Sequence, residues 1–90
     1  MSAQEAEGTP AFPASPALVL DLKGLKCPLP VLRTRKALAG LPAGARVMVL
    51  CTDPMSAIDI PHLMHETGHV LEARDVTDGV LMFHLRKVAG

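Results

Sequence analysis

The stretch Gly24-Leu25-Lys26-Cys27-Pro28-Leu29-Pro30 decides how the rest of the chain is interpreted, because a single cysteine stands in it between two different patterns. Before it, residues 18–22 (LVLDL) are rich in branched apolar side chains and predict a strand. After it, Pro28 suits the first position of a helix, and Pro30 is tolerated within the same turn. The sequence therefore predicts that Cys27 lies at or just before the N-terminus of a helix.

A cysteine in this position has two interpretations. Unpaired backbone N–H groups and the helix dipole favour an anion, and Lys26 adds positive charge, so the pKa of the Cys27 thiol is predicted to lie below the free-cysteine value of about 8.5. Gly24 gives the turn backbone freedom, and the two prolines stiffen it with the sulfur outward. This favours a nucleophilic or sulfur-carrying cysteine. The alternative is a small buried cysteine at a strand–helix junction, since free Cys is among the most buried residue types.

Length and composition limit the class of protein. Ninety residues, 49% of them hydrophobic and two of them aromatic, are enough for one sheet with a helix layer. The formal net charge is zero, which disfavours a basic nucleic-acid-binding surface, and stacking aromatics are scarce. No apolar run approaches the roughly 18 residues of a membrane helix, and the start of the sequence does not have the pattern of a signal peptide. Two cysteines outside a C-x-x-C motif fit a reducing cytosol, so a cytoplasmic protein is expected.

The chain divides into a tail and one domain. Residues 1–17 are rich in Ser, Ala, Pro, Gly and Glu without an apolar period, and they predict a disordered N-terminal tail. Residues 18–90 form the domain. Its predicted elements are a strand at 18–22, a helix from Pro28 to Leu38 or Ala39, a strand at 45–51, a helix from Pro54 or Met55 to Glu66, and strands at 69–76 and 80–87. The predicted order is therefore β-α-β-α-β-β.

Several residues in these elements have more than one interpretation. Cys51 ends the most apolar strand and is expected to pack in the core. Asp53 follows it as a helix cap or turn residue, at the sheet edge where Cys27 is also expected. Arg35 lies on the flank of the first helix, either solvated or binding an anionic partner. Pro61 either kinks the second helix or starts it after a short turn.

Three histidines, His62, His65 and His69, have a spacing that a metal site can use. Gly68 is expected to end the helix before His69, and no acidic or cysteine ligand joins the three in sequence. No metal and no other cofactor is therefore predicted.

Taken together, these motifs resemble the TusA/SirA-like (YedF-type) family of small sulfur carriers. The resemblance covers residues 18–88. It is carried by four motifs in order: Asp21-x-x-Gly24-Leu25-x-Cys27-Pro28-x-Pro30, Lys36-x-Leu38, Asp53-Pro54-x-x-x-x-Asp59-Ile60-Pro61 and Gly68-His69. Many members have an aromatic residue and a cysteine after Asp-Ile-Pro, where this chain has Leu63 and Met64, which are interpreted as packing positions.

The resemblance implies a fold and a function. The fold is an α+β two-layer sandwich, with two helices on one face of a four-stranded mixed sheet. The function is a sulfurtransferase-type sulfur carrier in which Cys27 bears a persulfide. Its sulfur comes from a cysteine desulfurase or a rhodanese-like protein and passes to a DsrE-like or similar acceptor. Arg35 and Asp53 correspond to positions implicated in partner contact, and Lys26 is the basic neighbour of the cysteine.

Two other functions stay open at this point. One is a non-catalytic binding or regulatory module of the same fold, which would tolerate replacement of Cys27. The other is a thiol oxidoreductase in which Cys51 resolves an oxidised Cys27, which requires their Cα atoms to lie within about 7 Å. The resemblance also does not choose between transfer-RNA thiolation, cofactor sulfuration and sulfur oxidation as the pathway.

Overall fold

The computed structural model describes residues 18–88, and the predicted tail at residues 1–17 lies outside the described residues. The elements are β1 (Leu18–Asp21), α1 (Leu29–Ala39), β2 (Arg46–Cys51), α2 (Ser56–Thr67), β3 (Val70–Thr77) and β4 (Val80–Arg86). This is the β-α-β-α-β-β order that the sequence predicts, with boundaries displaced by only a residue or two.

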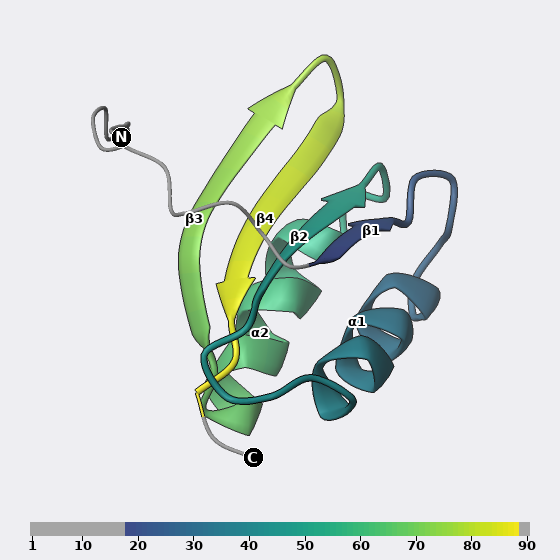
Figure 1. Cartoon of the computed structure of the whole chain (residues 1–90). Helices are drawn as coiled ribbons and strands as arrows, with labels where there is room; N and C mark the ends of the chain where they lie inside the picture. Colours follow the sequence, from purple (N-terminus) through teal and green to yellow (C-terminus); the bar gives the residue numbers. More distant parts are fainter. Residues whose placement is uncertain (1–17, 89–90) are drawn as a thin grey trace, which may run out of the picture.

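The four strands form one mixed sheet in the order β1-β2-β4-β3. β1 pairs with β2 in parallel, whereas β4 is antiparallel to both β2 and β3. Figure 1 shows that α1 and α2 both lie on one face of this sheet, so the predicted α+β two-layer sandwich is confirmed. Because β1 and β2 are parallel neighbours joined through α1, their carboxyl ends lie at the same edge of the sheet.

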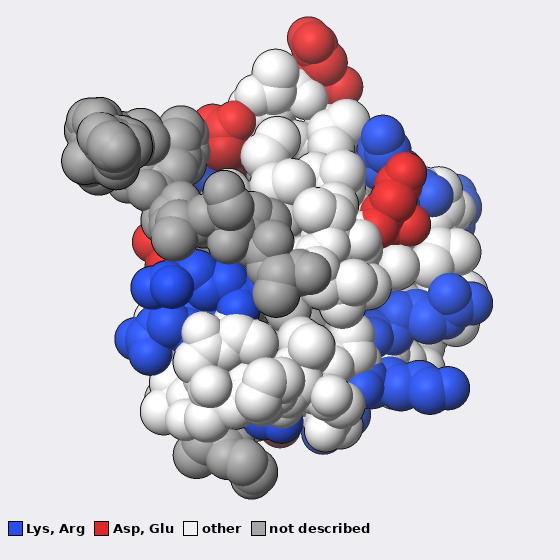
Figure 2. Space-filling view, viewed as in Figure 1, with Lys and Arg blue, Asp and Glu red and all other residues white. Residues whose placement is uncertain are grey.

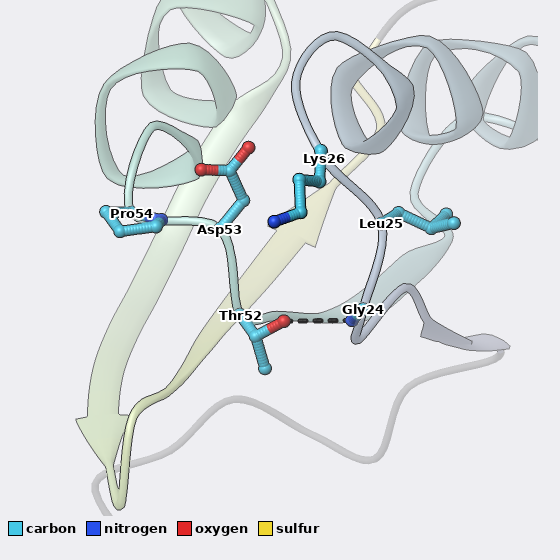
Figure 3. Close-up of a pocket in the computed structure, with 6 residues that line it drawn as sticks. All are labelled: Gly24, Leu25, Lys26, Thr52, Asp53 and Pro54. Carbon is cyan, nitrogen blue, oxygen red and sulfur yellow. Dashed lines mark hydrogen bonds between the residues drawn. The ribbon is translucent and has the colours of Figure 1, made fainter.

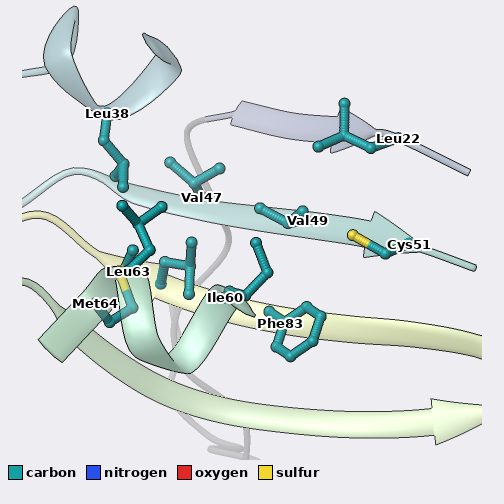
Figure 4. Close-up of a cluster of buried hydrophobic side chains, with 10 residues drawn as sticks. Leu22, Leu38, Val47, Val49, Cys51, Ile60, Leu63, Met64 and Phe83 are labelled. Carbon is teal, nitrogen blue, oxygen red and sulfur yellow. The ribbon is translucent and has the colours of Figure 1, made fainter. Parts of the chain in front are cut away.

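The core lies between this sheet and the two helices (Figure 4). β2 alternates half-buried and buried residues, with Val47, Val49 and Cys51 facing the helices. Phe83 and Leu85 of β4 complete the sheet side. The helix side is made by Leu38 of α1 and by Ile60, Leu63 and Met64 of α2, all at most 2% exposed. Leu63 and Met64 are therefore packing residues, as predicted.

Among residues 18–88, no helix lies over the opposite face of the sheet. The register places Val19, Met48 and Met82 on this face, between the residues that point into the core. At one end of it Glu72 accepts hydrogen bonds from Arg46 and Arg86, at 2.9 Å from each Nε. Figure 2 shows this side of the molecule, where the visible surface over the middle of the strands carries no charged side chains.

Two sequence signals have clear structural outcomes. Asp78 and Gly79 both have positive φ (51° and 78°), which matches a tight hairpin turn between β3 and β4. Pro61 lies inside α2, which continues through it to Thr67. The alternative in which the helix starts at Pro61 was wrong, because the backbone is already helical from Ser56.

Candidate functional site

The loops after β1 and β2 lie side by side at the carboxyl edge of the sheet. Figure 3 shows the first loop, with Gly24, Leu25 and Lys26, facing Thr52, Asp53 and Pro54 of the second. The Gly24 amide donates a hydrogen bond to Thr52 Oγ1 at 2.8 Å. Gly24 has φ of 86°, a conformation that side chains disfavour, so glycine is needed where the chain turns toward Cys27.

The carboxylate of Asp53 joins the cysteine loop to the start of α2. Its Oδ2 accepts the backbone N–H of Cys27 at 2.5 Å, and its Oδ1 accepts that of Met55 at 3.1 Å. These two backbone donors, first Cys27 and then Met55, hold the pKa of Asp53 below its ordinary value. The predicted proximity of Asp53 and Cys27 is thus observed, and Asp53 has an anchoring role in addition to its expected turn role.

The Lys26 ammonium does not lie within ion-pair distance of the Asp53 carboxylate, but its charge still acts on the site. Its side chain points toward the Asp53 loop (Figure 3), where its charge also lowers the pKa of Asp53. The described residues therefore place one cation beside Cys27, on the loop that precedes it.

Cys27 is exposed, and its thiol donates a hydrogen bond to Oδ2 of Asp59 in the first turn of α2, at 3.3 Å. This hydrogen bond raises the pKa of the Cys27 thiol above its ordinary value, since it stabilises the protonated form. Slight desolvation and the negative charges of Asp59 and Asp53 act in the same direction. The prediction of a lowered thiol pKa was therefore wrong.

The helix terminus does not supply the expected N–H donors. α1 begins at Leu29, and Pro28 and Pro30 have no backbone N–H. The Leu29 amide donates to the carbonyl of Lys26 at 2.8 Å instead of to the sulfur. The same prolines that shape the turn thus remove most of the amides that favour a thiolate, and the nearest charged group is the Asp59 carboxylate.

A shallow groove runs from the sulfur between the two helices. It is lined by Cys27, Pro28, Val31, Arg35, Asp59, His62, Leu63 and Glu66. Cys27 and Asp59 lie where the helices begin. Further along, Arg35 pairs with Glu66 at 3.7 Å, and His62 approaches the same carboxylate at 3.4 Å. Arg35 therefore lines the same groove as the sulfur, but its guanidinium is paired with Glu66.

Asp59 is the functional candidate that the sequence analysis did not assign. It was quoted as part of the Asp59-Ile60-Pro61 motif without a role. The sequence signal that could have indicated its role is its place in the first turn of α2, the helix that starts beside Asp53.

The second cysteine is separate from this site. Cys51 is 0% exposed in the core, and both cysteines are free thiols. Burial raises the pKa of the Cys51 thiol, so this residue is a poor nucleophile. The predicted packing role agrees with its place in Figure 4.

The histidines do not converge. His62 pairs with Glu66, whereas His69 Nδ1 accepts the backbone N–H of Val88 at 3.2 Å. Across residues 18–88, no group of three His, Cys, Asp or Glu side chains is arranged to hold a metal ion. In the same range, no helix is long and apolar enough to cross a membrane.

Comparison with known proteins gives a consistent result. A family model described as sulfurtransferase TusA matches residues 18–87. A candidate sulfur carrier protein of Neisseria meningitidis serogroup A is 48% identical over 61 residues, covering 68% of this chain and 82% of that protein. The sulfur carrier protein TusA of Pseudomonas savastanoi pv. phaseolicola is 38% identical over 69 residues, covering 77% of this chain and 82% of that protein.

A solved structure shares the fold as well as the sequence. The crystal structure of a SirA-like protein from Desulfitobacterium hafniense matches with a TM-score of 0.72 and 30% identity, covering 79% of this chain and 97% of that one. With the family model matching nearly all of the described domain, this chain belongs to the TusA/SirA-like family of sulfur carriers.

Proposed function

We propose that the protein carries sulfur as a persulfide on Cys27 and relays it between two partner proteins. The observation that carries this proposal is the contrast between its two cysteines: Cys27 is exposed at the start of α1, and Cys51 is buried in the core. A relay requires two protein cysteines to meet, and the open groove at Cys27 leaves room for a second protein to approach the sulfur. Membership of the family supports the same function.

The chemistry is two successive exchanges at sulfur. In uptake, the Cys27 thiolate attacks the outer sulfur of a donor persulfide, forming the Cys27 S–S bond while the donor's own S–S bond breaks. The donor cysteine leaves as a thiolate and takes up the proton that Cys27 lost. In delivery, an acceptor thiolate attacks the outer sulfur, and Cys27 leaves as the thiolate and is protonated again. No external oxidant or reductant is needed, so the reaction requires no cofactor.

The donor in this proposal is a cysteine desulfurase or a rhodanese-like protein, and the acceptor is a DsrE-like or similar protein, both in the cytoplasm. Lys26, Asp53 and Arg35 are the proposed contact residues. The exposed Arg35, at 56% side-chain exposure, and the loop charges of Lys26 and Asp53 border the sulfur on two sides. Gly24, Pro28 and Pro30 shape the loop that presents the cysteine.

The test is sulfur loading measured by intact mass. The protein is incubated with a cysteine desulfurase and cysteine, and the mass is recorded before and after reduction. Wild type and Cys51→Ala should each gain one reducible sulfur atom, and Cys27→Ser should gain none. Loading of a folded Cys27→Ser variant would disprove the assignment of Cys27, and no loading of wild type by any donor would disprove the carrier proposal itself.

A further inference from the structure

The contact between Cys27 and Asp59 has a consequence for when sulfur transfer takes place. Asp59 Oδ2 lies 3.3 Å from the Cys27 sulfur and accepts its proton in a hydrogen bond. Within residues 18–88, no Lys, Arg or His side chain lies within ion-pair distance of Asp59. Among the described residues, the side-chain partner of this carboxylate is the reacting thiol.

We propose that Asp59 is a catalytic residue that keeps Cys27 protonated in the free carrier and releases it when a cationic group of the partner protein pairs with the Asp59 carboxylate. This inference deepens the proposed function and rests on it. In uptake, the thiol proton must leave Cys27 before the sulfur attacks, and a cation at Asp59 removes the acceptor that retains it. In delivery, the same cation stabilises the Cys27 thiolate as the acceptor takes the outer sulfur.

The charges facing the sulfur explain why a cation is needed. Asp59 faces it from α2, and Asp53 lies beneath its backbone in the loop after β2. The loop before α1 supplies two cations: Lys26, whose charge acts on Asp53, and Lys23, which pairs with Asp21. Further along the groove, Arg35 and His62 are both directed to Glu66. The carboxylates nearest the sulfur therefore outnumber the cations, and burial of this edge against a partner leaves negative charge to be neutralised.

Exposed apolar side chains at the starts of the two helices strengthen the effect. Leu29 on α1, and Met55 and Ile58 at the start of α2, are 41%, 46% and 64% exposed. A partner that covers them excludes water from the edge where Asp59 lies. Because charges interact more strongly when water is excluded, a single partner cation then changes the ionisation of Cys27 more than dissolved salt does.

The first test measures the thiol without any sulfur donor. The rate of Cys27 alkylation by iodoacetamide is followed against pH in wild type, Asp59→Asn and Asp75→Asn, an equivalent substitution on β3, where the carboxylate accepts a hydrogen bond from Thr77 and not from the thiol. Loss of the Asp59 charge should lower the midpoint by about one pH unit. At pH 7 the thiolate fraction then rises about tenfold and its nucleophilicity falls about threefold, so alkylation should be about threefold faster. Asp75→Asn should match wild type.

The second test supplies the cation directly. Cystamine, a dicationic disulfide, and 3,3′-dithiodipropionate, a dianionic one, each exchange with Cys27: the thiolate attacks one sulfur, a mixed disulfide forms and a small thiolate leaves. One unit charge about 4 Å from another in water changes the rate by about fivefold. Each rate is divided by the rate of the same disulfide with free cysteine, because the two leaving thiols differ in pKa. On this scale wild type should prefer cystamine by about this factor or more at low ionic strength, and Asp59→Asn should lose most of that preference.

The outcomes separate this inference from the proposed function. An unchanged alkylation midpoint in Asp59→Asn would show that Asp59 does not hold the thiol proton. Equal rates for the two disulfides in wild type would exclude recognition of a cation, and this measurement needs no variant to fold. Neither test involves a persulfide, so both can fail while Cys27 still loads sulfur, and both can succeed if it does not.

Discussion

Replacing Cys51 by alanine separates the structural cysteine from the chemical one. Cys51 is 0% exposed, so the substitution removes a buried sulfur of about methylene size from the core. The lost transfer free energy is about 0.8 kcal/mol, and the remaining cavity adds a comparable amount, giving a destabilisation of about 1–2 kcal/mol. For a domain of this size, each kcal/mol lowers Tm by roughly 4–8 °C.

The assay is urea unfolding followed by circular dichroism, with sulfur loading measured on the same samples. Cys51→Ala should have a lower midpoint at an unchanged m-value, and it should load sulfur as wild type does. Cys27→Ala is the matched control, because the Cys27 side chain is exposed. This variant should have a urea midpoint close to that of wild type and should load no sulfur. A folded Cys51→Ala protein that cannot load sulfur would refute this division of roles, as would a variant with unchanged stability.

Three further predictions follow from other contacts. Asp53→Ala should lower Tm clearly, because the carboxylate accepts hydrogen bonds from the amides of Cys27 and Met55. Arg35→Ala should change stability by no more than about 0.5 kcal/mol and should slow transfer to the partner. Equal melting curves for the two variants would exclude the anchoring role of Asp53. Burial raises the pKa of Glu72, but the hydrogen bonds from Arg46 and Arg86 outweigh it and leave the pKa below its ordinary value. The stabilisation by Glu72 is then present above the unfolded-state pKa and is lost as pH falls through the folded-state pKa. The Tm difference between wild type and Glu72→Gln should therefore shrink from pH 7 to about pH 3. A constant difference would contradict this role of Glu72. A chain that begins at Ala17 should melt within one or two degrees of the full chain, and a larger loss would show that the first residues pack on the domain.

Much of the fold could be predicted from local patterns. The apolar periods give the element order, Asp78-Gly79 marks the hairpin, and Gly24 marks the turn before the cysteine. The proximity of Cys27 and Asp53 also followed from the sequence, because both residues come after strands that lead into helices, and parallel neighbours end at one edge.

The electrostatics of the site depended on packing that local patterns do not report. Asp59 reaches the sulfur because α1 and α2 lie side by side on the sheet, and their relative position is set by the core residues between them. The loss of helix amides at Pro28 and Pro30 was readable in the sequence, since proline has no N–H. The prediction instead followed the general preference of helix N-termini for anions. That preference depends on free backbone N–H donors, which are missing at Pro28 and Pro30.

A single-turnover chase tests whether Cys27 both receives and gives up sulfur. The protein is loaded with radiolabelled sulfur from a cysteine desulfurase, separated from the donor, and mixed with an acceptor protein that carries an accessible cysteine. The label should be located on the Cys27 peptide before mixing and should move to the acceptor cysteine afterwards, which leaves Cys27 as a free thiol. Label that stays on Cys27, or that reaches the acceptor equally well from a Cys27→Ser protein treated in the same way, would contradict this role of Cys27.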